Sequence, residues 1–311
     1  MNKIKIGIPR ALLYHKYNIL WSNFFNNLKN VEVVVSPETN KEIISRGSSL
    51  TVDESCLSMK LFIGHVDYLV GKVDYVFIPR MVSVRRGEEL CTKFMGLTET
   101  VRNIFDNLPV LSYTVNKSTF RFEFMGMMRV ALKLHQSPIT AVRAYIIAHR
   151  KYKEHFEKRL VGQDNKIKNI DRTKPVVLIV SHPYTTYDGF FGMHISKILG
   201  EQGIELLYSD IVNPELAHKM SKNLSSDLYW TYNKEMIGAI EIYKPYIDGI
   251  IYLVVFPCGP DALVVNLCQN KIKNIPSAVI TLDELQGEAG LKTRLESFAD
   301  ILKIRKSRTN V

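Results

Sequence analysis

Short apolar segments with the patterns of strands alternate with longer amphipathic segments along the chain. Polar and apolar positions alternate over residues 4–8, which predicts a first strand, and residues 13–28 have the spacing of an amphipathic helix. Residues 249–256 are almost entirely apolar, as in a strand buried on both faces. The same patterns predict strands at 31–35, 73–78, 110–112, 176–180, 204–207 and 277–282, and helices at 56–70, 191–202, 228–243 and 262–269.

The centre of the chain is expected to be helical. From about residue 120 to 160 the pattern has helical spacing, with a break at Ser137-Pro138 because proline disfavours continuation of a helix. A basic, polar linker is expected to follow before the alternation of strands and helices restarts. The last helix is expected to open at Thr293, which has capping-box spacing with Glu296.

Strands that alternate with helices over short connections favour mostly parallel sheets. The chain has 311 residues, enough for two domains of ordinary size. We therefore expect an α/β protein with mostly parallel sheets, in which a helical, basic connector joins two α/β domains. The expected boundaries are 1–118 for the first domain, 119–172 for the connector and 173–311 for the second domain.

The composition is that of an ordinary globular protein. Hydrophobic residues make up 46% and charged residues 23%, which argues against a disordered or fibrous chain. The longest apolar run, 250–256, is far shorter than the roughly 20 residues of a membrane-spanning helix. Met1 and Asn2 lead directly into the first predicted strand without the apolar region of a signal peptide. We therefore expect a cytoplasmic protein without membrane contact.

The excess of positive charge is local. The net charge is +10, and residues 143–174 alone contain ten basic and four acidic residues. Such a segment can be a patch for an acidic partner, such as a nucleic acid or a phosphorylated ligand, or a solvated helix face followed by a linker. We favour the solvated face, because no zinc-finger spacing or RNP-like aromatic motif points to nucleic acid.

Polar residues follow most of the predicted strands. In open α/β sheets, ligands bind beyond the carboxyl ends of the strands. These ends carry Pro9-Arg10, Pro79-Arg80 with the loop to Cys91, Ser181-His182-Pro183, Pro257-Cys258-Gly259-Pro260-Asp261, and Asp283-Glu284.

The four cysteines are Cys56, Cys91, Cys258 and Cys268, and none has C-x-x-C spacing, which excludes ferredoxin, zinc-ribbon and thioredoxin motifs. Cys91 and Cys258 fall on strand-end loops, and Cys56 in the first turn of a helix, where a thiol pKa is lowered. Cys268 lies among apolar residues of a predicted helix and is interpreted as a core thiol. The other three suit a soft metal centre, with iron–sulfur favoured over zinc, or are three unrelated thiols.

Several segments together resemble a known family. They are Ile6-Gly7-Ile8-Pro9-Arg10-Ala11-Leu12, Asp53-Glu54-Ser55-Cys56, Phe256-Pro257-Cys258-Gly259-Pro260-Asp261, and Asp283-Glu284 through Gly290 to Thr293-Arg294-Leu295-Glu296-Ser297-Phe298. Their order and spacing resemble the 2-hydroxyacyl-CoA dehydratase superfamily, which includes double-cubane cluster reductases. The chain is most similar to stand-alone proteins related to the large acyl-CoA dehydratase activases of anaerobic bacteria.

The resemblance implies two Rossmann-like domains with an oxygen-sensitive iron–sulfur cluster between them. Its ligands would be Cys56, Cys91 and Cys258, whereas Cys268 matches no motif of the family. The cluster would be 4Fe–4S, with a double-cubane 8Fe–9S cluster as the alternative. The implied electron donor is an ATP-hydrolysing activase, and a homodimer is implied as a possible assembly. The chain itself has no Walker A or G-x-G-x-x-G loop, which fits ATP use by the partner.

Our leading functional hypothesis is an oxidoreductase component that passes low-potential electrons from the activase to a small-molecule substrate. Arg10, Arg80 and Arg85 are candidates for offsetting the anionic cluster or holding an acidic substrate, or are surface arginines. His182 is a candidate proton donor, or a structural histidine at a strand end. The alternatives are a 2-hydroxyacyl-CoA dehydratase subunit, which is a lyase, and a cluster carrier or binding protein without catalysis.

Overall fold

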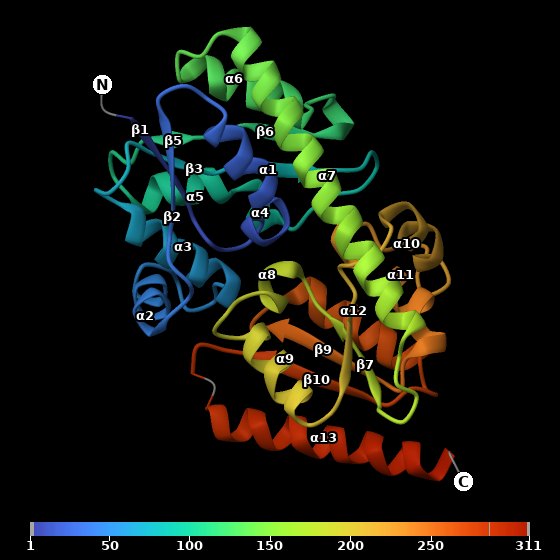
Figure 1. Ribbon diagram of the computed structural model, residues 1–311. Coiled ribbons are helices and arrows are strands. Elements are labelled where there is room, and N and C mark those ends of the chain that lie inside the picture. Colours follow the sequence, from blue (N-terminus) through green and yellow to red (C-terminus); the bar gives the residue numbers. More distant parts are fainter. Residues whose placement is uncertain (1–2, 286, 310–311) are drawn as a thin grey trace. The chain divides into compact units, whose positions relative to one another are not determined.

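The computed structural model describes residues 3–285 and 287–309 (Figure 1). The chain divides into two compact units, and each is described by itself. Unit 1 comprises residues 1–157 and 229–231, and unit 2 comprises residues 158–228 and 232–311.

Unit 1 is built on a parallel four-stranded sheet. Its strand order is β2-β1-β3-β5, and residues 4 to 8 of β1 pair in register with residues 31 to 35 of β2. A second, two-stranded parallel sheet pairs β4 with β6. The bounds are β1 (Ile4–Ile8), β2 (Val31–Val35), β3 (Tyr75–Phe77), β4 (Arg80–Ser83), β5 (Val110–Leu111) and β6 (Thr114–Asn116).

Aromatic side chains fill the core between the helices and the sheet of unit 1. Phe77 of β3 makes edge-to-face contacts with Trp21 and Phe25 of α1, with ring centroids 5.3 and 4.9 Å apart. Helices α2 and α3 pack at backbone distance, because Gly47 and Gly64 have no Cβ to hold them apart. The bounds are α1 (Tyr14–Asn26), α2 (Lys41–Ser49), α3 (Leu57–Leu69), α4 (Thr92–Met95), α5 (Leu97–Ile104), η1 (Lys117–Thr119) and α6 (Glu123–Lys133).

Unit 2 has a second parallel four-stranded sheet, in the order β10-β9-β7-β8. Every residue of β7 and β9 is buried, as their unbroken apolar runs predict. The bounds are β7 (Val176–Val180), α8 (Pro183–Thr186), α9 (Gly192–Glu201), β8 (Glu205–Tyr208), α10 (Pro214–Ser221), α11 (Thr231–Tyr243), η2 (Lys244–Tyr246), β9 (Gly249–Val255), α12 (Gly259–Lys271), β10 (Ser277–Leu282) and α13 (Glu288–Thr309).

The two four-stranded sheets have the same topology. In each unit the first strand of the sheet has the second strand on one side and the third on the other, with the fourth beyond the third. The chain therefore reverses direction across the sheet between β1 and β3 in unit 1, and between β7 and β9 in unit 2. Ligand sites of open α/β sheets form at such points, next to the carboxyl ends of the strands. The predicted fold class, α/β with mostly parallel sheets in two Rossmann-like domains, is confirmed.

Helix α7 (Pro138–Lys168) crosses from unit 1 into unit 2, since the boundary falls after Glu157. The predicted break before Pro138 is confirmed, but most of the expected polar linker is helical. Within α7, Arg150 pairs with Glu154 and Lys153 with Glu157 across one helical turn, which supports the helix.

The prediction for the last helix was wrong. Helix α13 begins at Glu288, five residues before the expected start, so Thr293 lies inside the helix. Its hydroxyl donates a hydrogen bond to the carbonyl oxygen of Ala289 one turn earlier, at 3.1 Å, instead of capping the helix. Among the described residues, no helix combines the length and the hydropathy of a membrane span.

Candidate functional site

Three of the four cysteines stand directly before a helix. Cys56 is the N-cap residue of α3 and Cys91 that of α4, both in unit 1, and Cys258 is the N-cap residue of α12 in unit 2. Each has an extended ψ of 103–150°, and its carbonyl oxygen accepts the first hydrogen bond of the helix. The three thiols are therefore held at the ends of loops by the helices that follow them.

The same three thiols are half-buried and none is in a disulfide, whereas Cys268 is buried inside α12. Burial raises the pKa of Cys268 to about 12, so this thiol stays protonated at neutral pH. The structure thus separates one inert core thiol from three accessible ones, as the sequence pattern predicts.

The chemistry of these donors suits a soft metal or an iron–sulfur cluster. Cys56 and Cys91 belong to unit 1 and Cys258 to unit 2. Within the described part of the chain, no three His, Cys, Asp or Glu side chains lie together as a ready metal site. The cluster ligands inferred from the resemblance therefore stay a prediction.

Unit 2 contains a buried polar network at its switch point, next to Cys258. His182 follows β7 and Asp261 lies in the first turn of α12, after β9. Nε2 of His182 is 2.9 Å from Oδ1 of Asp261, and the side-chain amide of Asn233 donates to the same oxygen at 2.9 Å. All three side chains are buried. The Pro-Cys-Gly-Pro-Asp segment thus carries a carboxylate that binds the strand-end histidine.

The surroundings of Asp261 favour its charged form. Burial by itself would raise the pKa of this carboxyl, but His182 and the hydrogen bonds from His182, Asn233 and the Cys258 thiol together lower it. The ring of Tyr184 stacks on His182 with centroids 4.9 Å apart, and Nδ1 of His182 is buried without a hydrogen-bond partner. The Asp261 carboxylate therefore orients the ring of His182 through Nε2, and Nδ1 makes no hydrogen bond within the protein.

Asp261 is a functional candidate that sequence reasoning did not single out. It belongs to one of the polar segments at the strand ends and to a segment that resembles the family, but no role was predicted for it. The signal that could have found it is the placement of both segments at the ends of neighbouring parallel strands.

Each of the three candidate arginines has a partner within the protein. The guanidinium of Arg10 forms an exposed ion pair with Glu38 at 3.2 Å. Nε of Arg80 donates to the carbonyl oxygen of Met95 at 2.7 Å, and Nε of Arg85 lies 3.8 Å from a carboxylate oxygen of Glu88. Each of them has a protein partner within unit 1 in addition to any ligand it would bind.

Unit 1 holds a second buried polar cluster that the sequence did not predict. Nδ1 of His65 lies 2.9 Å from the hydroxyl of Ser36, and Nε2 lies 3.1 Å from the hydroxyl of Thr39. Burial lowers the pKa of His65 to about 3, with smaller contributions from the charges of His15 and Arg10. The cluster is placed by β2 and α3 and holds a neutral histidine.

Two parallel sheets with the same strand order define a protein with two Rossmann-like α/β domains, and both units carry a cysteine directly before a helix. Residues 5–212 match the family described as CoA enzyme activase uncharacterised domain (DUF2229). Because the match covers more than half of the chain, the protein belongs to this family. The matched region includes Cys56, Cys91 and His182, and it ends before Cys258 and Asp261.

Solved structures give only a distant likeness. A Mn-bound periplasmic metal binding protein from candidatus liberibacter asiaticus is 14% identical, with 96% of this chain and 99% of that chain covered and a TM-score of 0.28. The periplasmic zinc binding protein TroA from Treponema pallidum is 10% identical, with 98% and 97% covered and a TM-score of 0.29. No curated protein matches the sequence.

Proposed function

We propose that this chain is an iron–sulfur protein of the CoA enzyme activase system. It would be reduced by a separate ATP-hydrolysing activase and pass low-potential electrons to a small-molecule substrate. Membership of the activase family supports the system, and the missing Walker A loop supports ATP use by a partner. The observation that carries the proposal is the common position of three half-buried thiols, each directly before a helix.

The proposed ligands are Cys56, Cys91 and Cys258, and the cluster, when bound, would supply one-electron transfer. Arg10, Arg80 and Arg85 would offset its negative charge or bind an acidic substrate. These roles rest on the family resemblance together with the thiol positions.

In the same proposal His182 would hold and deliver a proton. Asp261 would orient the ring of His182 through the 2.9 Å contact at Nε2. The other ring nitrogen, Nδ1, would then be the atom that carries the proton. Asp261 also accepts a hydrogen bond from the Cys258 thiol, and Cys258 would give up this bond when it bound the cluster as a thiolate. His182 is thus the proposed proton donor and Asp261 the proposed positioning residue.

The test is anaerobic purification followed by iron and acid-labile sulfide analysis and by electron paramagnetic resonance after reduction with dithionite. The wild-type chain should contain iron and sulfide and give a signal from a reduced cluster. Cys56→Ala, Cys91→Ala and Cys258→Ala should each lose most of the iron, whereas the matched variant Cys268→Ala should keep it. Circular dichroism checks that each variant is folded, because metal loss and unfolding can be coupled.

Three outcomes would overturn the proposal. The wild-type protein could lack iron and sulfide after anaerobic purification and reconstitution. Alternatively, Cys268→Ala alone could lose the iron, which would make the ligand assignment wrong. Finally, the reduced protein could transfer no electrons to any substrate and instead eliminate water from a 2-hydroxyacyl-CoA. That result would favour the lyase.

A further inference from the structure

Unit 1 exposes a large apolar face on the hairpin of α6 and the first half of α7. This α6–α7 face consists of Phe122, Phe124, Met125, Ile139, Val142 and Ile146. Ile139 is 83% exposed and Ile146 is 60% exposed, which is unusual for isoleucine in a helix. The ring of Phe124 contacts Tyr145 of α7 edge to face at 5.1 Å, so the apolar groups of the two helices adjoin.

The first half of α7 has two stripes of apolar residues with helical spacing. Ala141, Ala144 and Ala148 are fully buried and form the stripe that packs against unit 1. Ile139, Val142 and Ile146 form the other stripe, also at spacings of three and four, and they are exposed. The inner stripe therefore anchors the helix, while the outer stripe leaves apolar surface exposed.

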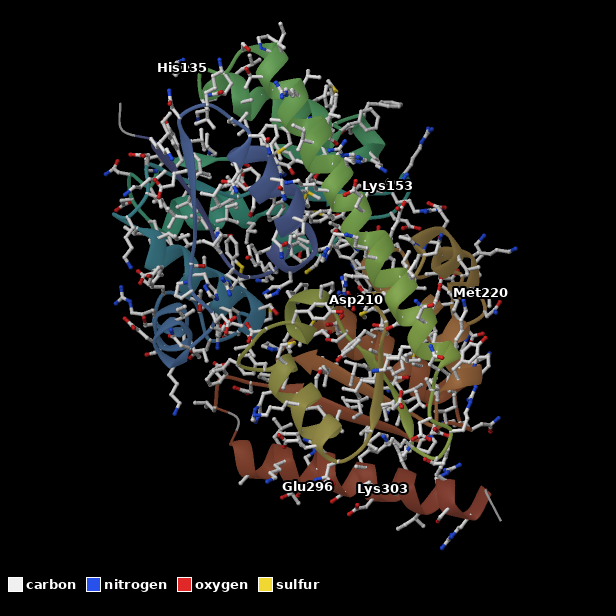
Figure 2. All side chains as sticks on the ribbon, in the orientation of Figure 1. His135, Lys153, Asp210, Met220, Glu296 and Lys303 are labelled. Carbon is white, nitrogen blue, oxygen red and sulfur yellow. The ribbon has the colours of Figure 1, made fainter. Side chains whose placement is uncertain are left out.

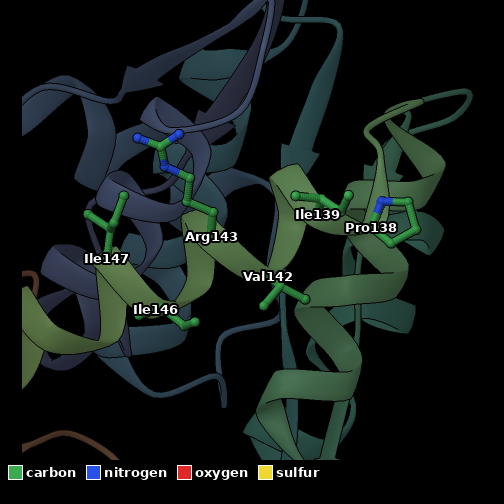
Figure 3. Close-up of a pocket in the computed structure, with 6 residues that line it drawn as sticks. All are labelled: Pro138, Ile139, Val142, Arg143, Ile146 and Ile147. Atoms are coloured by element: carbon green, nitrogen blue, oxygen red, sulfur yellow. The ribbon is translucent and has the colours of Figure 1, made fainter.

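The outer stripe borders a depression with a volume of about 650 Å³. Figure 3 shows the six residues that line it, all from the first three turns of α7: Pro138, Ile139, Val142, Arg143, Ile146 and Ile147. Only the guanidinium of Arg143 brings a charge to this lining. A depression of this size accepts a few apolar side chains of a partner.

The surroundings of the face are positively charged. No Asp or Glu occurs between Glu123 and Glu154, whereas Lys and Arg occur six times. Glu123 itself is turned inward and accepts a hydrogen bond from the hydroxyl of Tyr113 at 3.2 Å. The six cations are all exposed, and Lys153 is labelled on α7 in Figure 2: Arg129, Lys133, Arg143, Arg150, Lys151 and Lys153. Arg150 and Lys153 form ion pairs with Glu154 and Glu157, just beyond this stretch, and Lys151 donates to Asn23. The positive charge offered to a partner therefore rests mainly on Arg129, Lys133 and Arg143.

We propose that the α6–α7 face docks an amphipathic helix with acidic flanks from a partner protein. Apolar residues spaced by three and four form a ridge that packs against a similar ridge on another helix. The cations beside this ridge favour a partner helix with acidic residues along its flanks. A second copy bound through the same face would bring the basic residues of both copies together, which disfavours a homodimer here. This inference goes beyond the proposed function and needs no cluster.

The test uses the full-length chain and a yeast-displayed library of amphipathic helices of about 18 residues, or five turns. Each helix has a fixed leucine stripe, with Glu, Gln or Lys at the flanking positions. Selected helices should carry Glu over Lys at the flanks by roughly tenfold. Their affinity should fall by roughly tenfold for Ile146→Ser and for Arg143→Glu, which change exposed side chains and leave the fold intact.

The matched controls are Ile304→Ser and Lys197→Glu, which alter exposed residues of α13 and α9 in unit 2 and should change the affinity less than about twofold. Selection of no helix, or of helices without preference for Glu, would overturn the proposal. So would binding to vesicles of phosphatidylserine and phosphatidylcholine without any selected helix. A wild-type dimer in light scattering that becomes a monomer in Ile146→Ser would show that the face binds a second copy instead.

Discussion

Nε2 of His182 and Oδ1 of Asp261 are 2.9 Å apart and buried in unit 2. The two residues are 79 positions apart in the sequence and meet because β7 and β9 are neighbours in the sheet. Asp261 is the common acceptor of this contact and of the amide of Asn233. Removing the carboxylate would therefore take away the acceptor that His182 and Asn233 share, and the one that the Cys258 thiol uses.

We expect Asp261→Ala to lower the free energy of unfolding by roughly 2–4 kcal/mol, because buried donors lose their acceptor. Urea unfolding followed by circular dichroism measures this loss. The matched control is Asp300→Ala on α13, where the side chain is 67% exposed and pairs with Lys303, and a loss below about 0.5 kcal/mol is expected. Equal losses in the two variants would contradict the structural role of the network.

The buried His65 should make the stability depend on pH. Its pKa is lowered from 6.5 to about 3, so the unfolded chain binds a proton that the folded chain does not between these values. Neutral His65 makes its full contribution to the free energy of unfolding above about pH 6.5. As the pH falls below that value, the free energy of unfolding decreases by about 1.4 kcal/mol per pH unit. Urea unfolding at pH 7, 6 and 5 measures the slope.

His65→Asn should have a shallower pH slope than the wild-type chain, because the titrating group is removed. His135→Asn is the matched control: this residue is exposed and has a φ of 56°, a conformation that asparagine tolerates. A slope in His65→Asn as steep as that of the wild type would contradict the prediction.

The glycines at the contact of α2 and α3 should not tolerate a methyl group. A Cβ on Gly47 would overlap the carbonyl oxygen of Lys60, and one on Gly64 that of Ile43. Gly47→Ala and Gly64→Ala should therefore each cost at least roughly 1–3 kcal/mol, since backbone atoms must move. Thermal unfolding measures the loss as a lower melting temperature.

Substitution of two other helical glycines by alanine should have the opposite effect on stability. Gly162 in α7 and Gly200 in α9 have open space where a Cβ would lie. Alanine at these positions should stabilise the chain by about 0.5–1 kcal/mol, because it has the better helix propensity. A loss of stability at Gly162 or Gly200 as large as at Gly64 would refute the argument from close packing.

The thiols should differ in their reactivity. In cluster-free native protein at pH 8, iodoacetamide should alkylate Cys56, Cys91 and Cys258 and leave Cys268 unmodified. Cys268 is buried with its pKa raised to about 12, so only on the order of one molecule in ten thousand carries the reactive thiolate. Peptide mass spectrometry identifies the modified sites, and in urea all four should react. Modification of native Cys268 as fast as of Cys91 would disprove its burial.

The strands of unit 2 show how much the sequence predicts. The apolar runs predict β7, β9 and β10 to within one residue, and the pattern is strongest for β7 and β9, which are buried on both faces. The rule for strand ends then indicates that His182 and Cys258 lie at the same edge of a sheet. The contact of His182 with Asp261 was not predicted, because it depends on the order of the strands, which no local pattern contains.

The misses have physical causes as well. Helix α2 was not predicted, because Gly47 and the serines around it have low helix propensity, and the helix is held by its contact with α3. The start of α13 was misplaced because Thr293 satisfies its hydroxyl inside the helix. The joint use of three cysteines by one cluster stays a prediction, because it depends on both units together.

Helix α7 determines how the chain can be cut into fragments. Its last turns are part of unit 2: Gln163 binds the backbone of Tyr208 and Ile211, and Arg159 binds Asp210, labelled in Figure 2. A recombinant fragment that starts just before β7, where sequence patterns suggest a domain start, would expose the end of β8 to solvent. A fragment of unit 2 made for crystallisation should therefore start at or before Lys158. It would then retain the last eleven residues of α7, 158–168, which pack on the sheet.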